Sequence, residues 1–135
     1  MPQKPEPTDA DQNSIHELRR IVWQHLVDRD WDNPTPRSLA ISLSLEANEL
    51  LEHYQWSDEA VGDKEALGEE LADVLIYALQ YAHVMGIDPA EAIRDKLAKS
   101  CKKYPAEHFK GQGSHEKRHR WLQAKLNHRE QKKSL

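Results

Sequence analysis

The chain has 135 residues, a length that favours a single domain. Hydrophobic residues make up 38% and charged residues 31%, with a mean hydropathy of −0.88, and the apolar residues cluster in the middle of the chain. No apolar run approaches the roughly 18–20 residues that span a bilayer. The formal net charge of −4 excludes a chain that is basic throughout. We therefore expect no membrane contact and do not expect nucleic acid as the partner.

The first thirteen residues contain Pro2, Pro5 and Pro7 among scattered charges, and they predict a flexible lead. This segment lacks the apolar core of a secretory signal. The only cysteine, Cys101, has no second cysteine with which to form an internal disulfide. Both features favour a cytoplasmic protein.

Helical periodicity begins directly after the lead. Ser14 is an N-cap candidate, and Glu17 follows it at capping-box spacing. The apolar positions that come next recur at helical intervals until residues 33–36, which contain two prolines and end the helix. A second helix is predicted over residues 37–56, with four residues on its apolar face: Leu39, Leu43, Leu50 and Tyr54.

Two further helices follow a polar turn. The third is predicted over residues 64–85, where Gly86 is a natural C-terminal stop. The fourth begins with Asp88 as N-cap and Pro89 at the first helical position, and it stops at Pro105. No segment shows the sustained alternation of a strand, so the sequence predicts an all-α fold.

The predicted architecture is a bundle of four helices over residues 14–105, followed by a basic tail over 106–135. Within the tail, residues 115–130 are compatible with a helix that carries a thin apolar stripe. His115 and His119 have the spacing of metal ligands, but tail histidines are more often exposed and unligated. Four short helices with much apolar surface also indicate an oligomer, at least a dimer.

Two carboxylate pairs stand out on the second and third predicted helices. Glu46 and Glu49 are three residues apart, as are Glu70 and Asp73, so the members of each pair share a helix face. At ~1.5 Å rise per residue, both pairs lie roughly 10–12 Å from the turn that joins the helices. Antiparallel packing of the two helices would bring the four carboxylates face to face.

Facing carboxylates repel one another and are costly to desolvate, and a hard divalent cation removes both problems. Mg²⁺ is usually held by carboxylates together with substrate phosphates. From spacing alone, a metal site and a solvated acidic face with chance spacing both remain open. Glu52 continues the series, either as a surface residue or as part of the site.

Several segments together resemble a known family. Glu46–Trp56, Glu69–Tyr77, Lys96 and Lys103–Pro105 are similar to the corresponding motifs of the MazG-like all-α nucleoside triphosphate pyrophosphohydrolases. The resemblance is greatest to the dCTP pyrophosphatase branch and covers about Ile15–Pro105. Any one of these segments would carry little weight, whereas their combination is specific.

The resemblance implies an oligomeric, all-helical enzyme that depends on Mg²⁺, with Mn²⁺ as a possible substitute. Such enzymes split nucleoside triphosphates between the α and β phosphates and release the monophosphate and pyrophosphate. For this chain the resemblance implies a nucleoside triphosphate substrate with a pyrimidine, dCTP-like preference, a homodimer or homotetramer, and a role in nucleotide-pool housekeeping.

The resemblance also implies roles for the acidic residues. Four of them would be metal ligands: Glu46, Glu49, Glu70 and Asp73. We expect that Glu49, if it is not fully used in coordination, orients the attacking water and acts as the catalytic carboxylate. No serine, cysteine or histidine nucleophile is needed for this chemistry.

Aromatic and basic residues complete the implied site. Matching positions line the base pocket in the dCTP branch: Trp31, Trp56 and Tyr77. Three residues of the fourth helix and its end are candidates for phosphate binding: Lys96, Lys103 and Tyr104. Without the resemblance, core packing would explain the aromatic residues and a solvated face the lysines. Ser100 departs from the Asn that is usual in that branch, which puts a phosphate or sugar contact there in doubt.

Two rival functions come from other classes. A di-iron carboxylate bundle normally needs Glu-x-x-His pairs, and none occurs between Ser14 and Pro105. The second rival is a non-catalytic helical interaction module whose basic tail contacts nucleic acid. That alternative predicts salt-sensitive binding and no release of phosphate.

Overall fold

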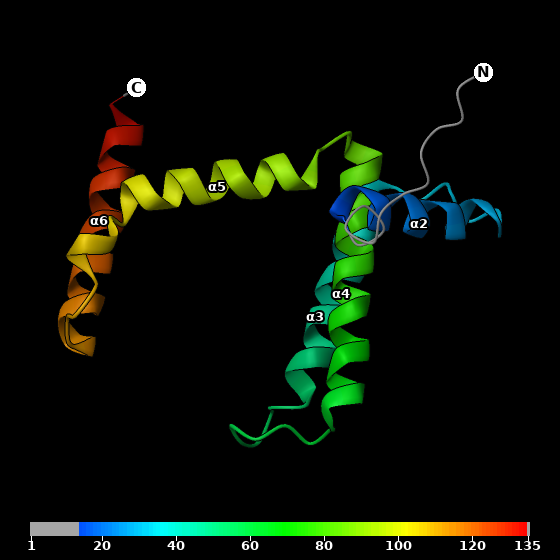
Figure 1. Ribbon diagram of the computed structural model, residues 1–135, viewed down its shortest axis with the longest axis horizontal. Helices are drawn as coiled ribbons and strands as arrows, with labels where there is room; N and C mark the ends of the chain where they lie inside the picture. Colours follow the sequence, from blue (N-terminus) through cyan, green and yellow to red (C-terminus); the bar gives the residue numbers. More distant parts are fainter. Residues whose placement is uncertain (1–13, 135) are drawn as a thin grey trace. The chain divides into compact units, whose positions relative to one another are not determined.

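The computed structural model describes residues 14–134, and the regular structure in this part of the chain is helical (Figure 1). The elements in chain order are α2 (Ile15–Val27), α3 (Pro36–Glu52), α4 (Lys64–Met85), α5 (Pro89–Lys103), the short 3₁₀ helix η1 (Ala106–His108) and α6 (Ser114–Lys133). No strand occurs among the described residues, which confirms the all-α prediction. The predicted flexible lead, residues 1–13, lies outside them.

The helices begin where capping side chains allow. The hydroxyl of Ser14 accepts a hydrogen bond from the Glu17 N–H at 3.2 Å. Thr35 and Ser38 satisfy each other's backbone N–H groups in a reciprocal capping box at 3.1 Å. The carboxylate of Asp63 accepts from the third residue of α4 at 2.9 Å. Each bond satisfies an N–H group that the first turn of a helix leaves without a partner.

Helix α3 ends at Glu52, earlier than predicted, and the reason is not local. The carbonyl of His53 accepts a hydrogen bond from the Val61 N–H at 2.9 Å, and His53 Nδ1 accepts from the Gly62 N–H at 3.1 Å. A Cβ atom at Gly62 would lie 2.5 Å from the His53 ring, so this approach requires glycine. As a result Trp56 lies in the loop after α3 instead of on a helical face.

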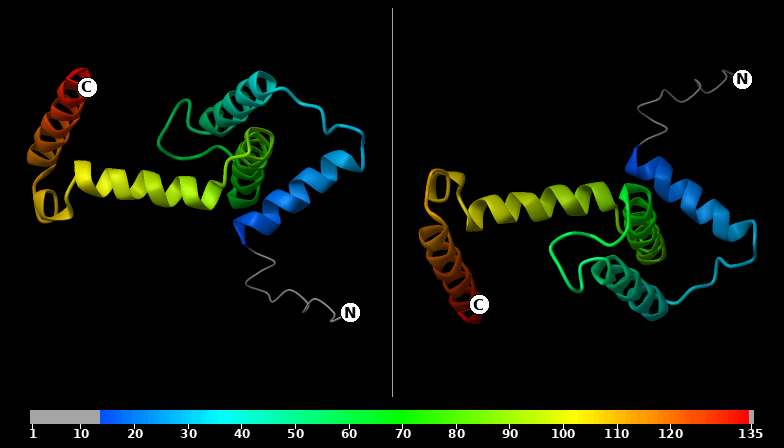
Figure 2. Two further views of the ribbon diagram at one scale, coloured as in Figure 1. Left: turned by 90° about the horizontal axis from the view of Figure 1, so that it is seen from above. Right: turned by 90° about the horizontal axis from the view of Figure 1, so that it is seen from below.

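Helix α4 is the centre of the first part of the fold. Helices α3 and α4 run antiparallel side by side, and α2 crosses α4 on another side (Figures 1 and 2). The buried residues come from all three helices: Leu26 of α2, Leu39 of α3, and Gln80 and Ala82 of α4. Among the described helices, none combines the length and the apolar character needed to cross a bilayer.

The chain divides into two compact units, one ending at Ala90 and the other beginning at Glu91. Two predicted signals lie near this boundary: Gly86 closes α4 in the left-handed conformation, with φ of 63°, and the Asp88 carboxylate accepts the Ala90 N–H at 2.9 Å. Most of α5 belongs to the second unit, together with η1 and α6. Helix α6 includes residues 115–130, the tail segment whose sequence is compatible with a helix. The domain limits of 14–105 stay a prediction.

Candidate functional site

Three of the four candidate metal ligands lie together between α3 and α4. Oxygen atoms of Glu46, Glu49 and Glu70 all lie within 4.8 Å of one another. Glu46 and Glu70 are half-buried and Glu49 is exposed. The antiparallel pairing of α3 and α4 places the acidic face of each helix opposite the other, as the spacing of the pairs predicts.

Asp73 lies one turn further along α4 and acts on the same group electrostatically. Burial, then the charges of Glu49 and Asp73, raise the pKa of Glu46. Hydrogen bonding with Glu70, followed by the Glu70 charge, raises the pKa of Glu49. Both pKa shifts include repulsion between neighbouring carboxylates, because clustered carboxyl groups resist ionising together when no positive charge is near.

The cluster fits a hard divalent cation. Its donor atoms are carboxylate oxygens, the ligands that Mg²⁺ and Mn²⁺ prefer, and there is no thiol in the group. A cation at Glu46, Glu49 and Glu70 would remove the repulsion that raises the pKa of Glu46 and Glu49. Exposure of Glu49 leaves one side of the cluster open to water and to a phosphate-bearing ligand.

Sequence reasoning missed His53, which lies against the cluster. Its Nδ1 accepts the Gly62 N–H at 3.1 Å, so a neutral imidazole carries its proton on Nε2. Nε2 lies 3.6 Å from Oε1 of Glu70. A histidine fixed on one side by the backbone and facing a candidate metal ligand on the other helps to orient that carboxylate. No local pattern reveals this, because the orientation of His53 depends on the loop that returns at Gly62.

A cavity of about 430 Å³ lies beside the carboxylates, among α2, the loop after it and α4. Trp31 and Tyr77, two of the three predicted base-binding residues, line this cavity. Trp31 is 61% exposed, and the Arg29 guanidinium lies over its ring, with Cζ 5.9 Å from the centroid. Asp73 lines the same cavity and also acts on Glu46, so the cavity and the carboxylate cluster share a residue.

The third aromatic candidate lies elsewhere. Trp56 is 86% exposed in the loop after α3 and is not among the residues that line this cavity. Trp23, for which the sequence favours packing, stacks on His83 with ring centroids 3.9 Å apart. The structure therefore brings Trp31 and Tyr77 together and leaves Trp56 apart from them.

Gln80 is the second residue that sequence reasoning missed. It lies on α4, lines the cavity and is only 7% exposed. A signal for it was present, because Gln80 follows Tyr77 by three residues and Asp73 by seven, and so shares their helix face. Glutamine on a helix is usually a surface residue, which hides such a position.

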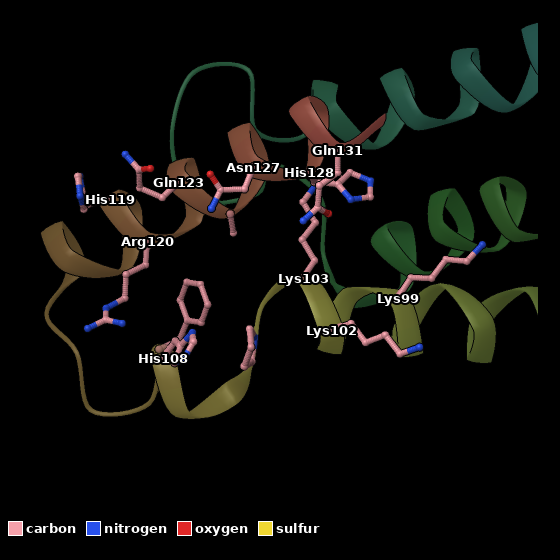
Figure 3. Close-up of a pocket in the computed structure, with 13 residues that line it drawn as sticks. Lys99, Lys102, Lys103, His108, His119, Arg120, Gln123, Asn127, His128 and Gln131 are labelled. Atoms are coloured by element: carbon pink, nitrogen blue, oxygen red, sulfur yellow. The ribbon is translucent and has the colours of Figure 1, made fainter. Parts of the chain in front are cut away.

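The predicted phosphate-binding residues belong to α5 and its end. Lys103 extends over the Tyr104 ring, with Nζ 5.2 Å from the centroid. Lys103 also lines a cavity of about 610 Å³ between α5 and α6, where Lys99, Lys102 and Arg120 lie as well (Figure 3). Lys96 is exposed on the same helix, and Ser100 is partly buried. Helix α5 therefore carries several cationic side chains at its surface.

Comparisons with known proteins agree with this geometry. A model of the MazG-like family matches residues 41–117, which include the whole carboxylate cluster. Mouse dCTP pyrophosphatase 1 is 34% identical over 116 residues, covering 79% of this chain and 65% of that protein. The human protein of the same name is 32% identical over 111 residues, covering 76% of this chain and 62% of that protein.

A solved structure is also similar. A pyrophosphatase from Archaeoglobus fulgidus DSM 4304 superposes with a TM-score of 0.63 at 34% sequence identity, covering 76% of this chain and 99% of that one. The chain spans about 65% of the length of the mouse dCTP pyrophosphatase that it matches. The helical fold, the placed carboxylates and the family match over more than half of the residues agree, and the chain belongs to the MazG-like family.

Proposed function

We propose that this protein is a divalent-cation-dependent nucleoside triphosphate pyrophosphohydrolase, which converts a (deoxy)nucleoside triphosphate into its monophosphate and pyrophosphate. The observation that carries the proposal is the position of Asp73, which joins the carboxylate cluster to the aromatic cavity. Phosphates at the cluster and a base in the cavity would then belong to one molecule. The names of the mouse and archaeal relatives support the same chemistry.

Each side chain of the cluster has a proposed role. Glu46, Glu49, Glu70 and Asp73 hold Mg²⁺, for which Mn²⁺ can substitute. When bound, the cation polarises phosphorus and neutralises phosphate charge. Glu49, the exposed member, also accepts a hydrogen bond from the attacking water and orients it.

The rest of the substrate has its own set of proposed contacts. Lys96, Lys103 and Tyr104 bind phosphate oxygens, since lysines offset charge that the cation leaves. Trp31 and Tyr77 stack on the base, and Trp56 joins them when the loop after α3 reaches the site. We also propose a pyrimidine preference, which the names of the dCTP pyrophosphatase 1 relatives support, and a role in nucleotide-pool housekeeping.

The first prediction tests the reaction itself. Incubation of the protein with single NTPs and dNTPs and Mg²⁺ is expected to yield the monophosphate and pyrophosphate in equal amounts, with dCTP among the best substrates. Ion-exchange chromatography of the products, with a pyrophosphate-specific assay, measures this directly. EDTA should stop the reaction. Orthophosphate as the sole inorganic product would reject the proposal, and equal turnover of purine and pyrimidine dNTPs would reject the pyrimidine preference alone.

The functional form is proposed to be a homodimer or homotetramer. Among the described residues only three hydrophobic side chains are buried, whereas Leu45, Leu51 and Leu75 of α3 and α4 are between 54% and 61% exposed. Exposed apolar surface on this scale marks an interaction site in a folded protein. Burying these leucines against a second copy of the chain would supply the missing core.

One observation favours a second candidate function, binding of nucleic acid by the basic second unit. From Glu91 onward, Lys and Arg outnumber Asp and Glu more than two to one. None of the described residues that line the α5–α6 cavity is acidic, while four are Lys or Arg and three are His (Figure 3). Burial, and after it the charges of Lys103 and neighbouring lysines, lowers the pKa of His128. A phosphate backbone would offset this charge.

The second prediction separates this candidate from the first. If the cavity binds nucleic acid, the double variant Lys102→Gln/Arg120→Gln should weaken binding of a labelled single-stranded oligonucleotide by about tenfold or more at low salt. Lys117→Gln/Arg118→Gln removes the same charge from exposed positions outside the cavity and is the matched control. Fluorescence anisotropy at several salt concentrations gives the affinities. Equal losses in both variants, or no binding by the wild type, would discard this function.

A further inference from the structure

Gln80 presents an unusual combination of burial and unused hydrogen-bonding capacity. It is 7% exposed, yet among residues 14–134 no hydrogen bond engages its side-chain amide. In the same part of the chain, no fully buried side-chain polar atom is left without a partner. The amide therefore keeps access to space that is open to a ligand, and that space is the 430 Å³ cavity that Gln80 lines.

Because the amide reaches the cavity, it is not sealed from water. A ligand that fills the cavity must therefore offer the amide hydrogen bonds in return, since an amide cut off from water without a partner is unfavourable. Around it the cavity is largely apolar, with Ile21, Leu26 and Ile76 among its lining residues. An apolar cavity with a few placed polar groups is the usual form of a small-molecule site, in which the polar groups fix orientation and specificity.

We propose that Gln80 recognises the hydrogen-bonding edge of the substrate base while Trp31 and Tyr77 contact its faces. This inference rests on the proposed function and names the specificity residue of that site. A side-chain amide offers an NH₂ donor and a carbonyl acceptor side by side. Cytosine presents a matching pair: its 4-amino group donates to the carbonyl of Gln80, and its N3 accepts from the amide NH₂ group.

The same geometry sets a limit on what Gln80 distinguishes. Uracil and thymine present N3–H as donor and O4 as acceptor, the reverse order. Rotation of the terminal amide by half a turn exchanges its donor and acceptor, so Gln80 serves either pyrimidine. Gln80 therefore selects a base with an adjacent donor and acceptor, and any preference between cytosine and uracil comes from other groups.

The third prediction tests this with a substrate that lacks half of the edge. The triphosphate of the deoxynucleoside of pyrimidin-2-one has no 4-amino group. We expect the wild type to favour dCTP over this analogue by roughly 5- to 150-fold in kcat/KM, the discrimination of a good bidentate contact. In Gln80→Met, which keeps the length of the side chain without the amide, the ratio should fall toward one, mainly through a higher KM for dCTP.

A merely structural role of Gln80 predicts something different, because damage to the cavity would slow both substrates equally and leave the ratio unchanged. Ile76→Val is the control: it alters the cavity wall without touching the amide and should keep the wild-type ratio. An unchanged ratio in Gln80→Met, with the wild type active, would overturn the inference and leave the hydrolase standing.

A parallel binding measurement separates failure of the inference from failure of the proposed function. Calorimetry with α,β-methylene dCTP, which is not cleaved at that bond, measures the dissociation constant for wild type and Gln80→Met. If the wild type releases no pyrophosphate, but the Gln80→Met variant binds this analogue more weakly than the wild type does, the proposed hydrolase activity fails and base recognition by Gln80 stands. If it neither hydrolyses nor binds, both are overturned.

Discussion

Glu49→Gln is expected to lower pyrophosphate release by at least about 10²–10³-fold, the loss typical when one electrostatic group of an active site is removed. Glu49 is the exposed member of a group whose oxygens lie within 4.8 Å of one another, so it has direct access to a bound phosphate and to water. Gln keeps the shape of the side chain and removes the charge that is proposed to bind the cation. Steady-state kinetics with dCTP and Mg²⁺ measure the effect.

The same variant should keep its fold, and without metal it should be at least as stable as the wild type. The pKa of both Glu46 and Glu49 is raised above the ordinary carboxyl value of 4.5 in the folded state. A raised carboxyl pKa means that the contribution to stability is present below that value and is lost as the pH rises through the folded-state pKa. The metal-free wild type should therefore lose stability over that range, and Glu49→Gln should lose less.

Adding Mg²⁺ reverses the order. A cation that binds only the folded state raises the melting temperature, and the rise should be larger in the wild type than in Glu49→Gln. Thermal unfolding followed by circular dichroism, with EDTA or with Mg²⁺, gives both comparisons. Glu65→Gln, an exposed substitution on α4 outside the cluster, is the matched control and should keep wild-type turnover. Wild-type turnover in Glu49→Gln would remove this residue from the site.

Features that depend on neighbouring residues were predictable from sequence. The Ser14 cap, the Gly86 stop and the start of α4 rest on contacts within four residues. The meeting of Glu46, Glu49 and Glu70 needed one step more, the antiparallel return of α4 along α3 after the polar loop of residues 53–63. The predicted equal distance of the two pairs from the turn does not hold, because α3 ends at Glu52: Glu49 lies three residues before the end of its helix and Glu70 six residues after the start of α4.

Features that depend on distant parts of the chain were not predictable. The sequence predicts that α3 continues to Trp56. The helix ends at Glu52 instead, because His53 accepts hydrogen bonds from Val61 and Gly62 across the loop. Because the helix ends early, Trp56 lies in the loop and does not share a helix face with Glu49. The aromatic cavity likewise needs α2 to lie across α4, a tertiary contact that no helical pattern encodes.

Trp31→Ala is expected to lower kcat/KM for dCTP by about five- to over a hundredfold. An aromatic face contributes roughly 1–3 kcal/mol when it stacks on a base, and ~1.4 kcal/mol corresponds to tenfold. Trp31 is 61% exposed at the rim of a cavity that it shares with Tyr77, so truncation should cost little stability. Its backbone N–H, which donates to the Leu26 carbonyl at 3.0 Å, is unaffected by the change.

Two further tryptophans serve as controls for Trp31. Trp23→Ala should lower the melting temperature and leave kcat/KM nearly unchanged, because Trp23 stacks on His83 and does not line the cavity. Trp56→Ala decides where the base site ends. A loss equal to that of Trp31→Ala would mean that the loop after α3 closes over the base, whereas wild-type kinetics would confine stacking to the cavity. If Trp31→Ala itself lost only stability, Trp31 would be a packing residue and the base would bind elsewhere.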